Sequence, residues 1–125
     1  MANRILWLNN DSNMTGTIER SLGDEYALSF VATPEEAFAR LKSEIIDLFI
    51  SDVQPLEGDG IGVIKQVVES FPEIPCLVLY TEQDRDAALA AVRAGATEVL
   101  QKPFSGENLA FILKKLFEQQ RLAGA

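Results

Sequence analysis

The chain of 125 residues is 47 % hydrophobic and 24 % charged, a composition that predicts one globular domain, residues 1–125, with a core of its own. Its net charge of −8 argues against nucleic acid or an anionic membrane as a direct partner, because both bind basic surfaces, and no apolar run is long enough to span a membrane. The absence of histidine excludes histidine-based catalysis and histidine metal ligands, and the single cysteine, Cys76, has no partner within the chain, which predicts a reducing, cytoplasmic setting.

Short apolar segments alternate with segments of helical periodicity five times along the chain. Strands are predicted at residues 4–8, 26–31, 46–51, 76–80 and 98–101. A helix is predicted after each strand, marked by Met14, Ile18 and Leu22 in the first, Ala37, Phe38 and Leu41 in the second, Ile61, Ile64, Val67 and Val68 in the third, residues 84–94 in the fourth, and Leu109, Ile112, Leu113 and Leu116 in the fifth. This order predicts an α/β fold with a parallel sheet covered by helices on both faces.

Several helix ends carry their own local signals. Thr33 is predicted as an N-cap, with Pro34 at the first helical position and Glu36 three residues after the cap. Gly95 is predicted to close the fourth helix in a left-handed conformation, and the fifth helix is predicted to begin near Ser105.

The polar residues that directly follow the strands are the candidate site. In open α/β sheets, ligands bind outside the carboxyl ends of the strands. The residues at those ends are Asn9, Asn10 and Asp11 after the first strand, Asp52 after the third, Thr81 after the fourth and Lys102 after the fifth. A carboxylate, a hydroxyl group and an ammonium group are therefore expected to converge, with amides beside them.

Several short motifs occur in order on these elements. They are DLFISD at 47–52, DG at 59–60, CLVLYT at 76–81, GA at 95–96 and KPF at 102–104. Together they resemble the receiver domain of response regulators in two-component signalling, over residues 4 to about 118. The resemblance implies a flavodoxin-like, doubly wound sheet of strand order 2-1-3-4-5 with five helices. It also implies a cis peptide bond before Pro103 and a sensor histidine kinase as partner.

By this resemblance Asp52 is the phosphoacceptor. An aspartate carboxylate can attack a phosphoryl group and form an acyl phosphate. Because phosphoryl transfer depends mainly on positioning and charge neutralisation, Lys102 is assigned the role of a positive charge and Thr81 that of a hydrogen-bond donor to a phosphoryl oxygen. The chain is therefore expected to perform at most self-catalysed phosphotransfer from the kinase. The alternative for Asp52 is a carboxylate that only caps a strand end.

The magnesium site of the family is altered at the end of the first strand. The resemblance implies Mg²⁺ ligands from an acidic pair, from Asp52 and from the backbone carbonyl of Gln54. Here the acidic pair is replaced by Asn9 and Asn10, and each lost charge removes up to ~8 kcal/mol of gross attraction at ~4 Å in a medium of dielectric ~20. We expect magnesium binding to be weak or absent, with Asp11 as a further candidate ligand. The alternative for Asn9 and Asn10 is that they form a turn and cap the first helix.

Three other positions depart from the family pattern. A proline expected four residues after the phosphoacceptor is found three residues after it, as Pro55. Glu82 replaces the small residue that usually follows the threonine, and it puts an anion beside a site meant to receive one. Val99 occupies the position of an aromatic switch residue on the fifth strand, so any switching would need another route.

Two other functions compete with a phosphoacceptor. One is a pseudo-receiver, locked in one conformation, which binds a protein or a second copy of itself through the face made by the fourth helix, fifth strand and fifth helix. The other is a flavodoxin-like cofactor binder, because SNMTGT at 12–17 resembles a phosphate-binding hydroxyl loop. That reading does not explain Asp52, Lys102 and Pro103 together.

Overall fold

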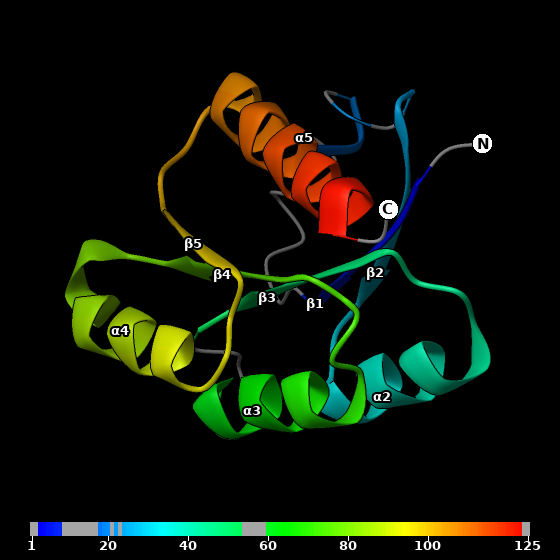
Figure 1. Ribbon diagram of the computed structural model, residues 1–125. Helices are drawn as coiled ribbons and strands as arrows, with labels where there is room; N and C mark the ends of the chain where they lie inside the picture. The colour runs from blue at the N-terminus through cyan, green and yellow to red at the C-terminus, as the bar shows by residue number, and fades with distance from the viewer. Residues whose placement is uncertain (1–2, 9–17, 21, 23, 54–59, 124–125) are drawn as a thin grey trace.

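The computed structural model describes residues 3–8, 18–20, 22, 24–53 and 60–123, and these contain one parallel sheet (Figure 1). Its strands are β1 (Asn3–Leu8), β2 (Tyr26–Val31), β3 (Leu48–Asp52), β4 (Cys76–Tyr80) and β5 (Glu98–Gln101). Their order is β2-β1-β3-β4-β5, as the resemblance implied, and every neighbouring pair is parallel. The expected flavodoxin-like fold is confirmed.

Helices cover both faces of this sheet. They are α2 (Pro34–Ser43), α3 (Gly60–Ser70), α4 (Arg85–Arg93), which follows the 3₁₀ turn η1 (Glu82–Asp84), and α5 (Gly106–Ala123). Figure 1 shows α2, α3 and α4 on one side and α5 on the other. Residues 18–20 and 22 are also helical, where the first helix was predicted, whereas Met14 and Gly23 lie outside the described residues. No helix in the described ranges is long and apolar enough to cross a membrane.

The third strand begins at Leu48, two residues later than predicted. This later start coincides with a contact between Asp47 and Arg4, which are distant in the sequence. The backbone N–H of Asp47 donates to the carbonyl of Arg4 at 2.8 Å, and the carboxylate of Asp47 accepts from the backbone N–H of Arg4 at 2.7 Å. Asp47 therefore joins β3 to the start of β1 as a bend, and the regular strand starts after it.

The predicted helix ends are confirmed. The Thr33 hydroxyl accepts from the backbone N–H of Glu36 at 3.2 Å, with Pro34 at the first helical position. The Ser105 hydroxyl accepts from the backbone N–H of Asn108 at the start of α5 in the same way. Each hydroxyl satisfies an N–H group that has no partner within its own helix.

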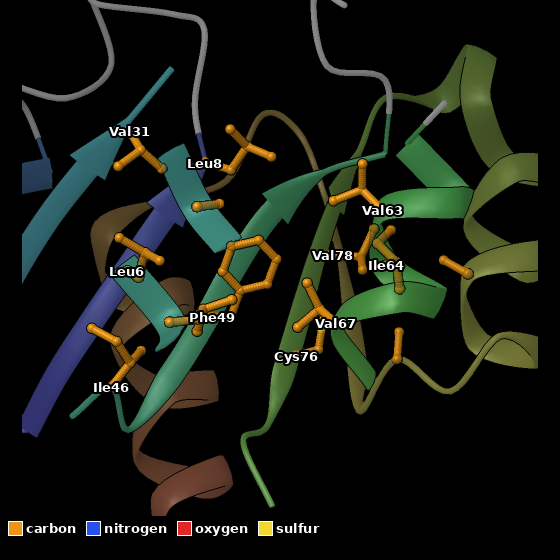
Figure 2. Close-up of a cluster of buried hydrophobic side chains, with 14 of the residues drawn as sticks. Leu6, Leu8, Val31, Ile46, Phe49, Val63, Ile64, Val67, Cys76 and Val78 are labelled. Atoms are coloured by element: carbon orange, nitrogen blue, oxygen red, sulfur yellow. The ribbon is translucent and has the colours of Figure 1, made fainter. Parts of the chain in front are cut away.

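The core is divided by the sheet into two layers. On one face, Phe49 of β3 and Val78 of β4 lie toward Ile64 and Val67 of α3, and Leu6 of β1 belongs to the same buried cluster (Figure 2). The other layer lies under α5, and its buried members are Ile5, Trp7, Ile18, Leu22, Leu48, Ile50, Leu77, Leu79, Leu109, Leu113 and Leu116. Burial on both faces explains why the central strands are continuous apolar runs, since each such side chain contributes roughly 1.5–3 kcal/mol when fully buried.

Replacement of Gly95 by alanine should destabilise the fold. Gly95 has a φ of +115°, and a Cβ atom there would lie 2.7 Å from Cγ1 of Val68. We expect Gly95→Ala to lower the free energy of unfolding by about 1–3 kcal/mol in urea denaturation. Combined with Val68→Ala, which is itself destabilising, Gly95→Ala should cost less than it does alone, because the close contact is removed and only the backbone strain remains. An unchanged urea midpoint in Gly95→Ala would contradict this account.

The thiol of Cys76 should be inert while the protein is folded. Burial raises its pKa from 9.0 to about 12. We expect no reaction with a disulfide reagent at pH 8 under native conditions and one equivalent of reaction in denaturant. Because the unfolded chain releases this proton at lower pH than the folded chain, the stability contributed by the thiol should fall as the pH rises from about 9 towards 12. Cys76→Ala should lose this part of the pH dependence.

Candidate functional site

The end of β3 carries a buried ion pair. Asp52 is the last residue of β3 and only 6 % exposed, and its Oδ1 lies 2.9 Å from Nζ of Lys102. The lysine side chain is 22 % exposed, so the cation of this pair is nearer to solvent than the carboxylate. The structure therefore joins two of the predicted site residues, which are fifty positions apart in the chain.

The parallel register brings this pair together. Asp52 is paired with Leu79 of β4, and Gln101 of β5 is paired with Tyr80 of β4. The ladder continues beyond the strands, because the N–H of Val53 donates to the carbonyl of Leu79 at 2.8 Å and the N–H of Lys102 to that of Tyr80 at 2.7 Å. The three strands therefore end at one edge, and the side chains that follow them meet there.

Thr81 lies at the same edge but is engaged elsewhere. It directly follows β4 and is exposed, and its hydroxyl donates to Oδ2 of Asp84 at 3.1 Å. Asp84 ends η1 and directly precedes α4. Sequence reasoning missed Asp84, although the Thr-x-x-Asp spacing at a helix start is a signal that could have found it.

The Lys102–Pro103 peptide bond is cis, as the resemblance implied. Glu82 is exposed in η1 and Val99 is half-buried in β5.

A hollow of about 250 Å³ lies between α4 and β5. It is lined by Tyr80, Arg85, Ala88, Leu89, Val92 and Val99.

The predicted metal ligands at the end of the first strand fall outside the described residues, and Gln54 does so too. These residues are Asn9, Asn10, Asp11 and Gln54, and Pro55, Asp59 and the segment 12–17 also lie outside. Within the part of the chain that is described, no three His, Cys, Asp or Glu side chains cluster in a way that could hold a metal ion. Of the proposed magnesium ligands, the structure describes only Asp52, whose Oδ1 faces the ammonium group of Lys102.

Comparison with known proteins identifies the family. The family model described as the response regulator receiver domain matches residues 5–114. The chain belongs to this family. It is 28 % identical over 117 residues to the DNA-binding transcriptional regulator NtrC of Salmonella typhimurium, covering 92 % of this chain and 25 % of NtrC. It is 30 % identical over 100 residues to the transcriptional regulatory protein ZraR of the same organism, covering 80 % of this chain and 23 % of ZraR. The receiver thus spans about a quarter of the length of these curated relatives.

Solved structures share the fold. A CheY-like response regulator receiver domain protein from Methanospirillum hungatei superimposes with a TM-score of 0.90 at 18 % identity, covering 98 % of this chain and 99 % of that one. A putative response regulator from Chloroflexus aurantiacus gives a TM-score of 0.84 at 28 % identity, covering 92 % and 97 %. The chain is therefore a receiver domain of two-component signalling, a family that uses Mg²⁺ and has a histidine kinase as partner.

The two halves of the ion pair should contribute unequally to stability. Lys102→Ala removes the ammonium group from a carboxylate that stays buried, whereas Asp52→Asn leaves an ammonium group that can turn to solvent. We expect Lys102→Ala to lower the free energy of unfolding by about 2–3 kcal/mol and Asp52→Asn by about 1 kcal/mol or less, measured in urea. Lys115→Ala is the matched control, because its ion pair with Glu98 is half-exposed and should matter by less than about 1 kcal/mol. Equal losses for Lys102→Ala and Asp52→Asn would contradict the burial argument.

Proposed function

We propose that this receiver accepts a phosphoryl group from a sensor histidine kinase on Asp52, with weakened or lost dependence on magnesium. The observation that supports this most directly is the 2.9 Å contact between Oδ1 of Asp52 and Nζ of Lys102 at the carboxyl edge of the sheet. In this proposal, residues 1–125 form one cytoplasmic receiver domain, which binds neither nucleic acid nor a membrane.

In the proposed reaction, a carboxylate oxygen of Asp52 attacks the phosphorus of a phosphohistidine. The new O–P bond forms as the P–N bond breaks, and the histidine nitrogen retains the electron pair and takes up a proton from solvent. Lys102 keeps a positive charge beside the oxygens on which negative charge accumulates. The backbone pairing of Lys102 with Tyr80 fixes where this side chain begins, and the contact with Asp52 places its ammonium group at the site before the transfer.

Thr81 would link the phosphoryl group to α4. Its hydroxyl group now donates to Asp84, at the start of that helix. A hydroxyl has one proton to donate, so a hydrogen bond to a phosphoryl oxygen would replace the one to Asp84. The exchange would alter the start of α4 without any movement of Val99, whose side chain has no ring to rotate.

The magnesium argument rests on charge. When bound, Mg²⁺ supplies positive charge to the phosphoryl oxygens, and the residues proposed to hold it are Asp52, the Gln54 carbonyl, Asn10 and Asn9, with Asp11 as a further candidate. Neutral amides replace two carboxylates in this set. We therefore propose that this domain is an atypical receiver in which Lys102 provides a larger share of the charge neutralisation.

A pseudo-receiver is the second candidate. It is favoured by the Thr81 hydroxyl, which already donates to Asp84, and by the neutral Asn9 and Asn10 in place of an acidic pair. In this alternative the domain works through protein contacts on the face made by α4, β5 and α5. Leu89 and Val92 of α4 are exposed there, beside the hollow next to β5.

Direct phosphorylation distinguishes the two candidates. The protein is treated with a small phosphoryl donor with and without millimolar Mg²⁺, and the intact mass is measured. We expect one added phosphoryl group, absent in Asp52→Ala and retained in Asp47→Asn, which alters a carboxylate at the opposite end of β3. No mass increase under any condition would favour the pseudo-receiver.

Metal binding is followed in parallel by the emission of Trp7, which is fully buried in β1. Asn9→Asp combined with Asn10→Asp should tighten magnesium binding by at least about 10-fold, because it restores two negative charges. An unchanged magnesium affinity in this double variant would contradict the charge argument while leaving phosphorylation of Asp52 to be judged by mass.

A further inference from the structure

A second polar side chain is buried directly beside the proposed phosphoacceptor. Among the residues that the structure describes, the buried polar or charged ones are Ser51, which is fully buried, and Asp52, which follows it in β3. The proposed reaction gives Ser51 no role. Because a buried polar group is unfavourable unless it is hydrogen-bonded, the contact that this hydroxyl makes is informative.

The Ser51 side chain lies on the opposite face of the sheet from the Asp52 carboxylate. Successive side chains of a strand point to opposite faces, so Ser51 shares a face with Phe49, two residues before it. Its register partners are Leu8 of β1 and Val78 of β4, and both belong to the buried cluster on that face (Figure 2). The hydroxyl therefore acts on the site through the backbone and not through the phosphoryl group itself.

The hydroxyl holds one end of the peptide group that joins Asp52 to Val53. Oγ of Ser51 donates to the carbonyl oxygen of Asp52 at 2.9 Å. The N–H of the same peptide group belongs to Val53 and donates to the carbonyl of Leu79 in β4 at 2.8 Å. Because a peptide group is planar, contacts at both of its ends restrict its orientation. This restriction limits ψ of Asp52, and with it the direction of the Cα–Cβ bond relative to β4.

We propose that Ser51 is a positioning residue for phosphoryl transfer, which holds the Asp52–Val53 peptide group so that the Asp52 carboxylate faces Lys102. This inference rests on the proposed function of Asp52 as phosphoacceptor. Phosphoryl transfer depends on the alignment of the attacking oxygen with the phosphorus and with the neutralising charge, and Oδ1 of Asp52 lies 2.9 Å from Nζ of Lys102. Loss of the hydroxyl should therefore slow the transfer and leave the binding of the phosphoryl donor unchanged.

Threonine and valine provide a matched pair of substitutions at this position. Their side chains have nearly the same shape, and threonine keeps the hydroxyl that valine lacks. Any effect of an added methyl group is common to Ser51→Thr and Ser51→Val, so the difference between these variants reports the hydroxyl. Ser51→Ala, compared with the unchanged protein, repeats the test without added volume. Circular dichroism and the urea midpoint establish that each variant is folded.

The first measurement is the rate of phosphorylation by acetyl phosphate, followed by intact mass over a range of donor concentrations. At saturating donor, we expect Ser51→Val to react about 5-fold more slowly than Ser51→Thr, with the same half-saturating donor concentration. Ser51→Ala should be slowed to a similar extent relative to the unchanged protein. Equal maximal rates in the threonine and valine variants, or an effect on the half-saturating concentration alone, would overturn the proposal.

The second measurement is independent of phosphorylation. Lys102→Ala is combined with Ser51→Thr and with Ser51→Val, and unfolding is followed in urea. If the hydroxyl directs the Asp52 carboxylate toward the ammonium group, Lys102→Ala should lower the folding equilibrium constant about 3-fold less in the valine background than in the threonine background. A hydroxyl that serves packing alone predicts equal losses in both backgrounds, and this result would refute the positioning role.

The two measurements separate failure of this inference from failure of the proposed function. If the unchanged protein takes up no phosphoryl group, the proposed function of Asp52 fails, and the urea comparison still decides whether Ser51 orients Asp52 toward Lys102. If the unchanged protein is phosphorylated and the threonine and valine variants react equally fast, the phosphoacceptor stands and the role of Ser51 is refuted.

Discussion

The parallel pairing of β3, β4 and β5 is the constraint on which the site depends. Parallel strands in neighbouring positions end at the same edge of a sheet, and the ladder here continues one residue past the strands through Val53 and Lys102. The backbone therefore sets the position of Lys102 before its side chain makes any contact. Its ammonium group then needs only the correct rotamers to reach Oδ1 of Asp52.

Burial of the sheet increases the effect of this ion pair on stability and on any anion bound at Asp52. Central strands covered on both faces leave no exposed side of the sheet, so a carboxylate at the end of β3 is almost as buried as the apolar residues before it. A buried charge without a counter-charge is costly, and the same burial strengthens the field that Lys102 exerts on any anion at Asp52. Lys102 would thus serve both stability and phosphoryl transfer. It now pairs with Asp52, and an incoming phosphoryl group would share the same cation.

The hydrogen bond from Thr81 to Asp84 gives the site a local connection to α4. The two residues flank the short turn η1, so a change in the direction of the Thr81 hydroxyl acts on the residue directly before the helix. This connection does not pass through β5, where Val99 cannot act as a rotating ring. This hydrogen bond therefore offers a route from the end of β4 to the start of α4 that does not involve β5.

Local structure can be predicted from the sequence alone. The approximate strand positions, the Thr33 cap and the Gly95 turn follow from short apolar runs, side-chain oxygens and missing Cβ atoms, which act over a few residues. The edge at which Asp52 and Lys102 meet was also predictable, because parallel topology follows from alternating strands and helices. The family motifs supplied the strand order, which periodicity cannot provide.

Only the tertiary structure decided which atoms meet. The start of β3 depends on Asp47 and Arg4, which are distant in sequence, and no local pattern reports such a contact. The sequence placed Thr81 at the site, but a competing acceptor three residues away holds its hydroxyl group. Helical periodicity could assign the buried side of α5, whereas the exposure of Phe111 and Leu122 depends on what the rest of the chain leaves uncovered. Sequence determines the local preferences, and long-range packing selects among the partners that those preferences allow.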